Sequence, residues 1–243
     1  MKVSDLERMI NEQERPIDEH AISAAFPALM RKVYIWMALA LAITGLTAWG
    51  VASSPSLVFT IVNNMPLFWG LLIAEIMLVV WLSVRLNKLS LTAATVIFIA
   101  YSVLNGVTMS FIFLAYAATS IAQTFFVTAA TFGVMAVLGT TTRRNLQSWN
   151  RYFLMALIGL IIAMLVNLFL GSSTLDLIIS GIGVVIFTVI VAVDTQKIRM
   201  MLELQPDLSE GSQKVALYGA LDLYLDFINL FLYLLRFMGD RNS

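Results

Sequence analysis

Residues 215–238 read VALYGALDLYLDFINLFLYLLRFM, an apolar run that nevertheless carries charged side chains. A membrane helix needs about 20 mainly apolar residues to cross about 30 Å of hydrocarbon, so this run is long enough. Its polar residues are spaced 4, 4, 3, 4 and 3 positions apart: Tyr218, Asp222, Asp226, Asn229, Tyr233 and Arg236. At about 100° per residue they fall within an arc of roughly 80° and cover about 27 Å of helix. Such a stripe must face protein or water, which predicts a membrane helix packed inside a bundle.

The rest of the chain is also too apolar for a soluble domain. Of its 243 residues, 60% are hydrophobic and 12% are charged, whereas soluble domains carry about 25% charged residues. Six further segments are long enough, or nearly so, to cross a membrane: Val33–Ala52, Pro66–Val84, Leu91–Tyr116, Ile121–Thr140, Tyr152–Leu170 and Leu175–Val193. The third is long, which implies tilt or a protruding end. We therefore predict an all-α polytopic membrane protein. Its charged tail, Met1–Lys32, precedes one seven-helix domain, residues 33–243.

Basic residues predict how the helices are oriented. Of the 15 lysines and arginines, all except Arg236 and Arg241 lie in the tail or in the connections after the second, fourth and sixth spans. The three opposite connections, residues 53–65, 117–120 and 171–174, contain none. Because basic loops stay on the cytoplasmic side, the N-terminus is expected to be cytoplasmic and the C-terminus external. Six spans with a re-entrant last segment would remove the two exceptions, but the length of residues 215–238 favours seven.

Several classes of function find no support in the sequence. Without cysteine, the chain has no disulfides, thiolate metal sites or cysteine nucleophiles. A net charge of zero gives no argument for nucleic-acid binding. An intramembrane aspartyl protease would need Gly-x-Gly-Asp, but Leu223 and Leu225 precede Asp226. A retinal protein would need a lysine in residues 215–238. We expect no enzymatic activity and no cofactor.

Ionisable residues inside a membrane are costly and mark functional sites. Glu75 lies near the middle of the second span, and it is expected either to pair with Arg236 or to be protonated and hydrogen-bonded to a neighbouring helix. Asp194 ends the sixth span and faces the half of the bundle that holds Asp222 and Asp226. Two close carboxylates in a low dielectric share a proton, and deprotonated they can contact a divalent cation. The alternative is that these polar groups only hold helices together by hydrogen bonds.

The depth of these carboxylates leaves the pairing open. With Val215 at the membrane surface, Asp226 lies about 16 Å deep while Asp194 lies near the surface. By depth alone, Asp222 is the easier partner for Asp194.

The segment Gly219–Gly239 closely resembles the C-terminal signature of the transmembrane Bax inhibitor motif family, above all its bacterial inner-membrane members. Val193–Ile198, Val33–Met37 and Thr140–Asn145 resemble further parts of it. The resemblance implies a seven-helix bundle whose last helix is surrounded by the other six. It also implies a pH-sensitive calcium leak controlled by an aspartate dyad, here Asp194 and Asp226.

The resemblance also covers charged residues around the dyad, and the sequence departs from the family pattern at one of them. A basic latch for the dyad would fall near Arg85, and Glu75 and Arg236 match positions that contribute charge inside the bundle. Asp222 departs from the pattern, where that position is usually uncharged, so the dyad could behave as a triad.

Two functions follow as expectations. The first is a calcium leak of the bacterial inner membrane, gated by protonation of Asp194 and Asp226, which would contact calcium transiently. Its partners would be the lipid bilayer, calcium ions and protons. The second is a modulator of a membrane quality-control protease or stress-response partner, contacted through the tail Met1–Lys32.

Overall fold

The computed structural model describes residues 19–240, with side chains from residue 25 onward except residue 87. The described residues contain helices and no β-strand. Seven segments are long and apolar enough to cross a membrane. Their main helices are α2 (Glu19–Ala52), α4 (Met65–Arg85), α5 (Leu91–Met109), α7 (Ala118–Thr141), α8 (Asn150–Leu170), α9 (Ser173–Glu203) and α10 (Glu210–Met238). The predicted all-α fold with seven membrane helices is confirmed.

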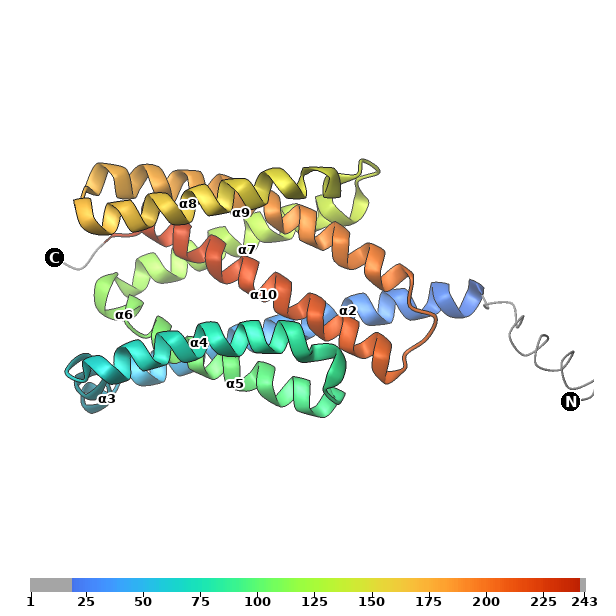
Figure 1. Cartoon of the computed structure of the whole chain (residues 1–243), viewed down its shortest axis with the longest axis horizontal. Coiled ribbons are helices and arrows are strands. Elements are labelled where there is room, and N and C mark those ends of the chain that lie inside the picture. The colour runs from blue at the N-terminus through green and yellow to red at the C-terminus, as the bar shows by residue number, and fades with distance from the viewer. Residues whose placement is uncertain (1–18, 241–243) are drawn as a thin grey trace, which may run out of the picture.

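The last helix occupies the centre of the bundle. In Figure 1, α10 runs between α7, α8 and α9 on one side and α2, α4 and α5 on the other. Buried residues make up 67% of the most apolar 18-residue stretch of α10, against 6% of the corresponding stretches in the spans of α4 and α8. It packs mainly on α2, α5, α7 and α9, while α4 packs mainly on α5 and α8 mainly on α9. The central position was predicted correctly, but four helices rather than six form most of its surroundings.

The two ends of the bundle differ in charge. Figure 1 places the two ends of the described chain at opposite ends of the bundle, as seven crossings require. Near the start of α10, Lys32 Nζ donates to Gln213 Oε1 at 2.7 Å and Lys214 Nζ donates to the Leu89 carbonyl at 3.1 Å. The connections rich in lysine and arginine meet there, and we call this the basic end. Because α10 crosses the whole bundle, it is not re-entrant.

Two helices extend beyond the predicted spans at the basic end. Helix α2 begins at Glu19 rather than Val33, and Ala25 and Leu29 from this extension are buried in the core. Helix α9 continues from Val193 to Glu203, so Asp194 lies well inside a helix. Of the predicted tail Met1–Lys32, residues 1–18 lie outside the described residues.

Two features lie at the opposite end. The long third span is not one tilted helix: after α5, the Ser110 amide donates to the Val107 carbonyl at 3.3 Å, and the chain resumes as α6 (Ile112–Ala115). A bond over three residues is typical of a tightened helix end. The connection after α2 forms α3 (Pro55–Val62), which starts with a proline in the first turn, where a missing amide proton is tolerated.

Short 3₁₀ turns, η1 (Leu86–Lys88) and η2 (Leu146–Trp149), precede α5 and α8.

Candidate functional site

The polar stripe of α10 faces α9. Gly183 on α9 lies so close to Tyr233 that an added Cβ would overlap the tyrosine ring. The Tyr233 ring stacks on Phe187 with centroids 5.4 Å apart, and the Lys197 ammonium lies 5.3 Å from the centroid of the Tyr218 ring. These contacts come from positions along much of α10, so the stripe packs against protein, as its narrow arc predicted.

Asp194 of α9 and Asp226 of α10 meet at this interface, with their carboxyl groups close enough to interact directly. Asp226 is 6% exposed, and its Oδ2 has no hydrogen-bond partner among the described residues. Two adjacent carboxylates cannot both be ionised cheaply in such a place, so a shared proton satisfies the contact. Asp194 reaches this depth because α9 continues nine residues to Glu203, about 13 Å of helix.

The cation beside the pair is Lys197. Its Nζ lies 3.0 Å from Asp222 Oδ2 and 3.5 Å from the Tyr218 hydroxyl. The side chains of Lys197 and Asp222 are 33% and 16% exposed, so the ion pair is largely shielded from solvent. The sequence interpretation used Lys197 only as a loop charge. Its spacing of three from Asp194, which puts both on one helix face, was the signal that could have found it.

Asp222 forms an ion pair with Lys197 and also lies close enough to Asp194 and Asp226 to act on both electrostatically. Among the described residues, no group of three or more histidine, cysteine, aspartate or glutamate side chains could hold a metal ion. Calcium prefers six to eight oxygen ligands. The pair of Asp194 and Asp226 offers carboxylates from only two residues, so a calcium ion there would keep much of its water.

Glu75 belongs to a second polar cluster, on the other side of α10. It accepts hydrogen bonds from Asn105 Nδ2 and, at 2.8 Å, from Thr108 Oγ1, both on α5. The Tyr224 hydroxyl on α10 donates to Asn105 Oδ1 at 3.1 Å and is paired with Thr44 Oγ1 of α2 at 2.7 Å. This cluster joins α2, α4, α5 and α10 through buried or half-buried groups.

Arg236 and Arg85 do not take the positions expected of them. Arg236 Nη1 lies 3.7 Å from Asp176 Oδ1 on α9, so the expected pairing with Glu75 is wrong; Glu75 accepts hydrogen bonds from α5 instead. Arg85 is exposed at the end of α4 and forms none of the ion pairs seen in the described part of the chain. The turn that follows Arg85, η1, contacts α10 near the start of that helix, where Lys214 Nζ donates to the Leu89 carbonyl.

Between Asp226 and Arg236, the stripe carries only neutral polar groups. Asn229 Nδ2 donates within α10 to the Leu225 carbonyl at 2.8 Å, and the Tyr233 hydroxyl contacts Met164 Sδ on α8 at 3.3 Å. These two stripe residues thus have local partners. An apolar cavity of about 310 Å³, lined in part by Phe227 and Ile228, lies beside this part of α10.

The chain is similar to known proteins over most of its length. Residues 27–243 match the family described as inhibitor of apoptosis-promoting Bax1. The chain is 44% identical over 220 residues to inner membrane protein YbhL of Escherichia coli K12, covering 90% of this chain and 94% of that protein. It is also 42% identical over 214 residues to an uncharacterized protein of Borreliella burgdorferi, covering 88% and 92% of the two chains. An uncharacterized protein of Deinococcus radiodurans is 37% identical over 240 residues, covering 99% and 100%. The seven-helix chain described above belongs to the Bax inhibitor family of membrane proteins.

Proposed function

We propose that the protein is a pH-sensitive calcium leak in which protonation of the Asp194–Asp226 pair controls the passage of cations beside α10. The observation that carries the proposal is the contact between these two carboxyl groups inside a membrane bundle. Buried ionisable side chains in a membrane are rare and concentrate on ion and proton pathways.

The pair couples proton binding to helix packing. Gain or loss of one proton changes the charge between α9 and α10 by one unit, in a place where solvent screens charge poorly. The interface is tightly packed, with Gly183 against Tyr233. A change of charge therefore moves α9 and α10 from one packed arrangement to another and does not deform the interface gradually. The deprotonated pair offers oxygen ligands to a partly hydrated calcium ion.

The ion pair of Lys197 and Asp222 supports a gating role for this region. It lies about one turn from Asp226 toward the basic end, so a cation entering from that end meets the Lys197 ammonium first. Farther along, Phe227 packs against Phe125 and Phe132 with ring centroids 5.5 and 5.6 Å apart. These rings form an apolar barrier, and passage through it requires α10 or its neighbours to move.

The proposed location is the inner membrane, since a relative with 44% identity is named as an inner membrane protein. The distribution of lysine and arginine supports an orientation with the basic end and the N-terminus in the cytoplasm and the C-terminus outside. The permeant ion is calcium, and the protein acts without a cofactor or catalytic chemistry.

The test is calcium flux into proteoliposomes, measured with an entrapped indicator over a series of pH values. The unaltered protein is expected to show a step in flux with pH. Asp194→Asn and Asp226→Asn should remove or displace that step, while Asp207→Asn, at the exposed α9–α10 connection, should keep it. Unchanged flux in both dyad variants at every pH would overturn the proposal, once thermal unfolding shows that the variants are folded.

A second candidate function is modulation of a membrane quality-control protease or stress-response partner. It is favoured by the N-terminal part of α2, which projects past the basic end of the bundle in Figure 1. Removal of residues 1–18 should then abolish crosslinking to the protease and leave calcium flux unchanged. Crosslinking that survives the deletion would count against this role for the tail.

A further inference from the structure

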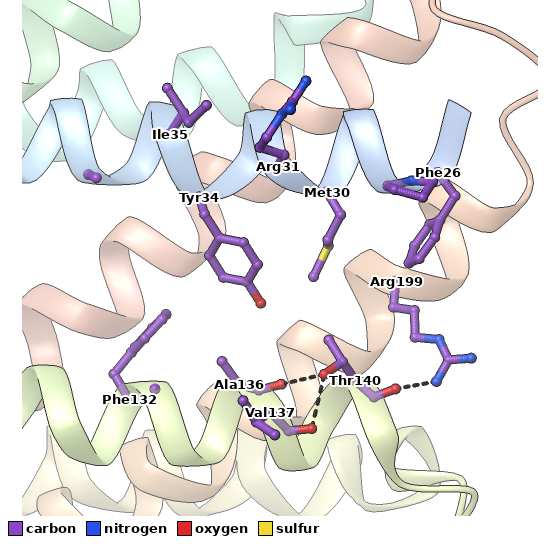
Figure 2. Close-up of a pocket in the computed structure, with 13 residues that line it drawn as sticks. Phe26, Met30, Arg31, Tyr34, Ile35, Phe132, Ala136, Val137, Thr140 and Arg199 are labelled. Carbon is purple, nitrogen blue, oxygen red and sulfur yellow. Dashed lines mark hydrogen bonds between the residues drawn. The ribbon is translucent and has the colours of Figure 1, made fainter. Parts of the chain in front are cut away.

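A groove between α2 and α7 opens on the side of the bundle near its basic end. It has a volume of about 970 Å³, and its walls are mainly apolar. In Figure 2, Met30 and Tyr34 point into it from α2, facing Phe132, Ala136 and Val137 on α7. A groove of this kind at membrane depth is shaped for a hydrocarbon chain rather than for a water-soluble ligand.

Arg199 of α9 stands at the end of the groove nearest the basic end of the bundle. Figure 2 shows its guanidinium beside Thr140, to whose carbonyl Nη1 donates. Nε donates to Glu203 Oε1 at 2.7 Å, and the Glu203 side chain is 42% exposed. Arg31 also lines the groove, but in Figure 2 its guanidinium points away from α7. Arg199 is therefore the cation placed at the groove mouth.

The same arginine also lines a second, more polar pocket. This pocket has a volume of about 430 Å³ and includes Arg143, Arg144, Arg199 and Glu203. Three arginines against one glutamate leave two net positive charges around it. The connection that carries Arg144 is held onto α9 by Gln196, whose Nε2 donates to the Arg144 carbonyl at 2.8 Å. Arg199 thus lines both the apolar groove and the basic pocket.

We infer that this composite site binds an anionic phospholipid from the leaflet at the basic end. The phosphate lies against Arg199 and the arginines of the neighbouring pocket, and one acyl chain lies in the groove between α2 and α7. Guanidinium groups match phosphate geometry and are weakly hydrated, so arginine suits this contact better than lysine. The net positive charge selects an anionic over a zwitterionic headgroup.

The chain offers a matched control on its opposite side. Another apolar groove, of about 750 Å³, runs along α4 and ends at Arg85, with Trp81 and Val84 among its lining residues. It has a single arginine and no basic pocket beside it among the lining residues. The apolar walls of both grooves suit an acyl chain, whereas the proposed headgroup contact exists only at the first.

The experiment titrates the full chain, purified in detergent, with phosphatidylglycerol or phosphatidylcholine of identical acyl chains and counts bound lipids by native mass spectrometry. The unaltered protein is expected to retain one phosphatidylglycerol in preference to phosphatidylcholine. Arg199→Gln, or Arg144→Gln if the first variant fails to fold, should weaken phosphatidylglycerol binding by about fivefold. Arg85→Gln should leave it unchanged.

A variant of the groove itself tests the acyl-chain contact. A Cβ added at Gly133 would meet nothing within 4 Å, so Gly133→Leu fits α7 and occupies groove space. It should reduce retention of the lipid without lowering the unfolding temperature, since leucine has a higher helix propensity than glycine. Equal affinity for both lipids, or equal loss in Arg85→Gln and Arg199→Gln, would refute the assignment. Displacement of the lipid by millimolar inorganic phosphate would also refute it, because the site would then be a simple anion site.

Discussion

Lys197 Nζ lies 3.0 Å from Asp222 Oδ2, across the interface between α9 and α10 and beside the contact of Asp194 with Asp226. An ion pair of this kind gives the interface a fixed charge arrangement next to the two adjacent carboxyl groups. With one proton shared by the dyad, Lys197 compensates Asp222, and a single negative charge remains on the Asp194–Asp226 pair. The lysine thereby keeps Asp222 from adding a further uncompensated charge to the dyad.

Replacement of Lys197 by methionine should destabilise the protein by about 1–3 kcal/mol. The Asp222 side chain, 16% exposed, would lose its partner, and removing one member of a shielded ion pair leaves an uncompensated charge. Thermal unfolding in detergent measures the effect. The double variant Lys197→Met with Asp222→Leu should recover part of the loss, since no charge then remains unpaired. If the double variant loses as much as the sum of the single variants, the pair is not coupled.

Gly139→Ala should destabilise the packing of α7 on α9 by about 1–3 kcal/mol, the usual cost of overpacking. An added Cβ at Gly139 would overlap the Ala192 carbonyl and lie 3.0 Å from Thr195 Cβ. Gly133→Ala on the same helix is the control, because its Cβ meets nothing within 4 Å and helix propensity favours alanine. Unfolding temperatures in one detergent compare the two. Similar temperatures for both variants would show that the helices separate easily at Gly139.

Tyr224→Phe should lower the unfolding free energy by about 1–3 kcal/mol while leaving the dyad in place. The hydroxyl is fully buried and bridges Thr44 to Asn105, so its removal leaves buried polar atoms without partners. Tyr152→Phe, at a side chain 56% exposed, is the matched control and should change stability by less than about 0.5 kcal/mol. Equal effects of the two substitutions would show that the buried cluster contributes no stability.

Much of this architecture could be predicted because the membrane restricts the choices. Apolar runs give the number of helices, and the narrow arc of Tyr218, Asp222 and Asp226 shows that the last helix must be enclosed. Helix ends were harder to place, because α9 does not stop where hydrophobicity does. The helix continues beyond Val193 as polar turns that carry Lys197, so Asp194 lies inside the bundle and not at its edge. Asp194 can therefore lie at the same depth as Asp226.

Partners across helices could not be predicted from spacing alone. Glu75 and Arg236 carry opposite charges, yet Glu75 lies on α4, which packs mainly against α5. Glu75 accepts its hydrogen bonds from α5. Arg85 is exposed at the end of α4 and forms none of the ion pairs of the described residues. The cationic partner of a buried carboxylate can be predicted only if the neighbours of each helix are known. These neighbours depend on side-chain packing, which hydropathy does not encode.

Acid should loosen the start of α10 through Asp207, which lies in the connection between α9 and α10, outside the membrane helices. Asp207 Oδ1 accepts hydrogen bonds from the Ser209 amide at 3.0 Å and from Ser212 Oγ at 3.1 Å. Hydrogen bonds from the Ser209 side chain and backbone, with a smaller one from Ser212, hold the pKa of Asp207 below its ordinary value. A lowered pKa means that this stabilisation is fully present above the unfolded-state pKa, about 3.9, and is lost as pH falls through the folded-state value.

Hydrogen exchange of residues 207–213, corrected for the intrinsic effect of pH, should therefore accelerate below about pH 4 in the unaltered protein. Asp207→Asn keeps an acceptor oxygen but cannot titrate, so its exchange should stay slow across the same range. Asp207→Ala has no acceptor and should exchange faster at every pH, without an acid step. The same acid step in all three proteins would assign the loosening to another group. A step confined to the unaltered protein would separate this local response of the connection from any pH dependence of the Asp194–Asp226 pair.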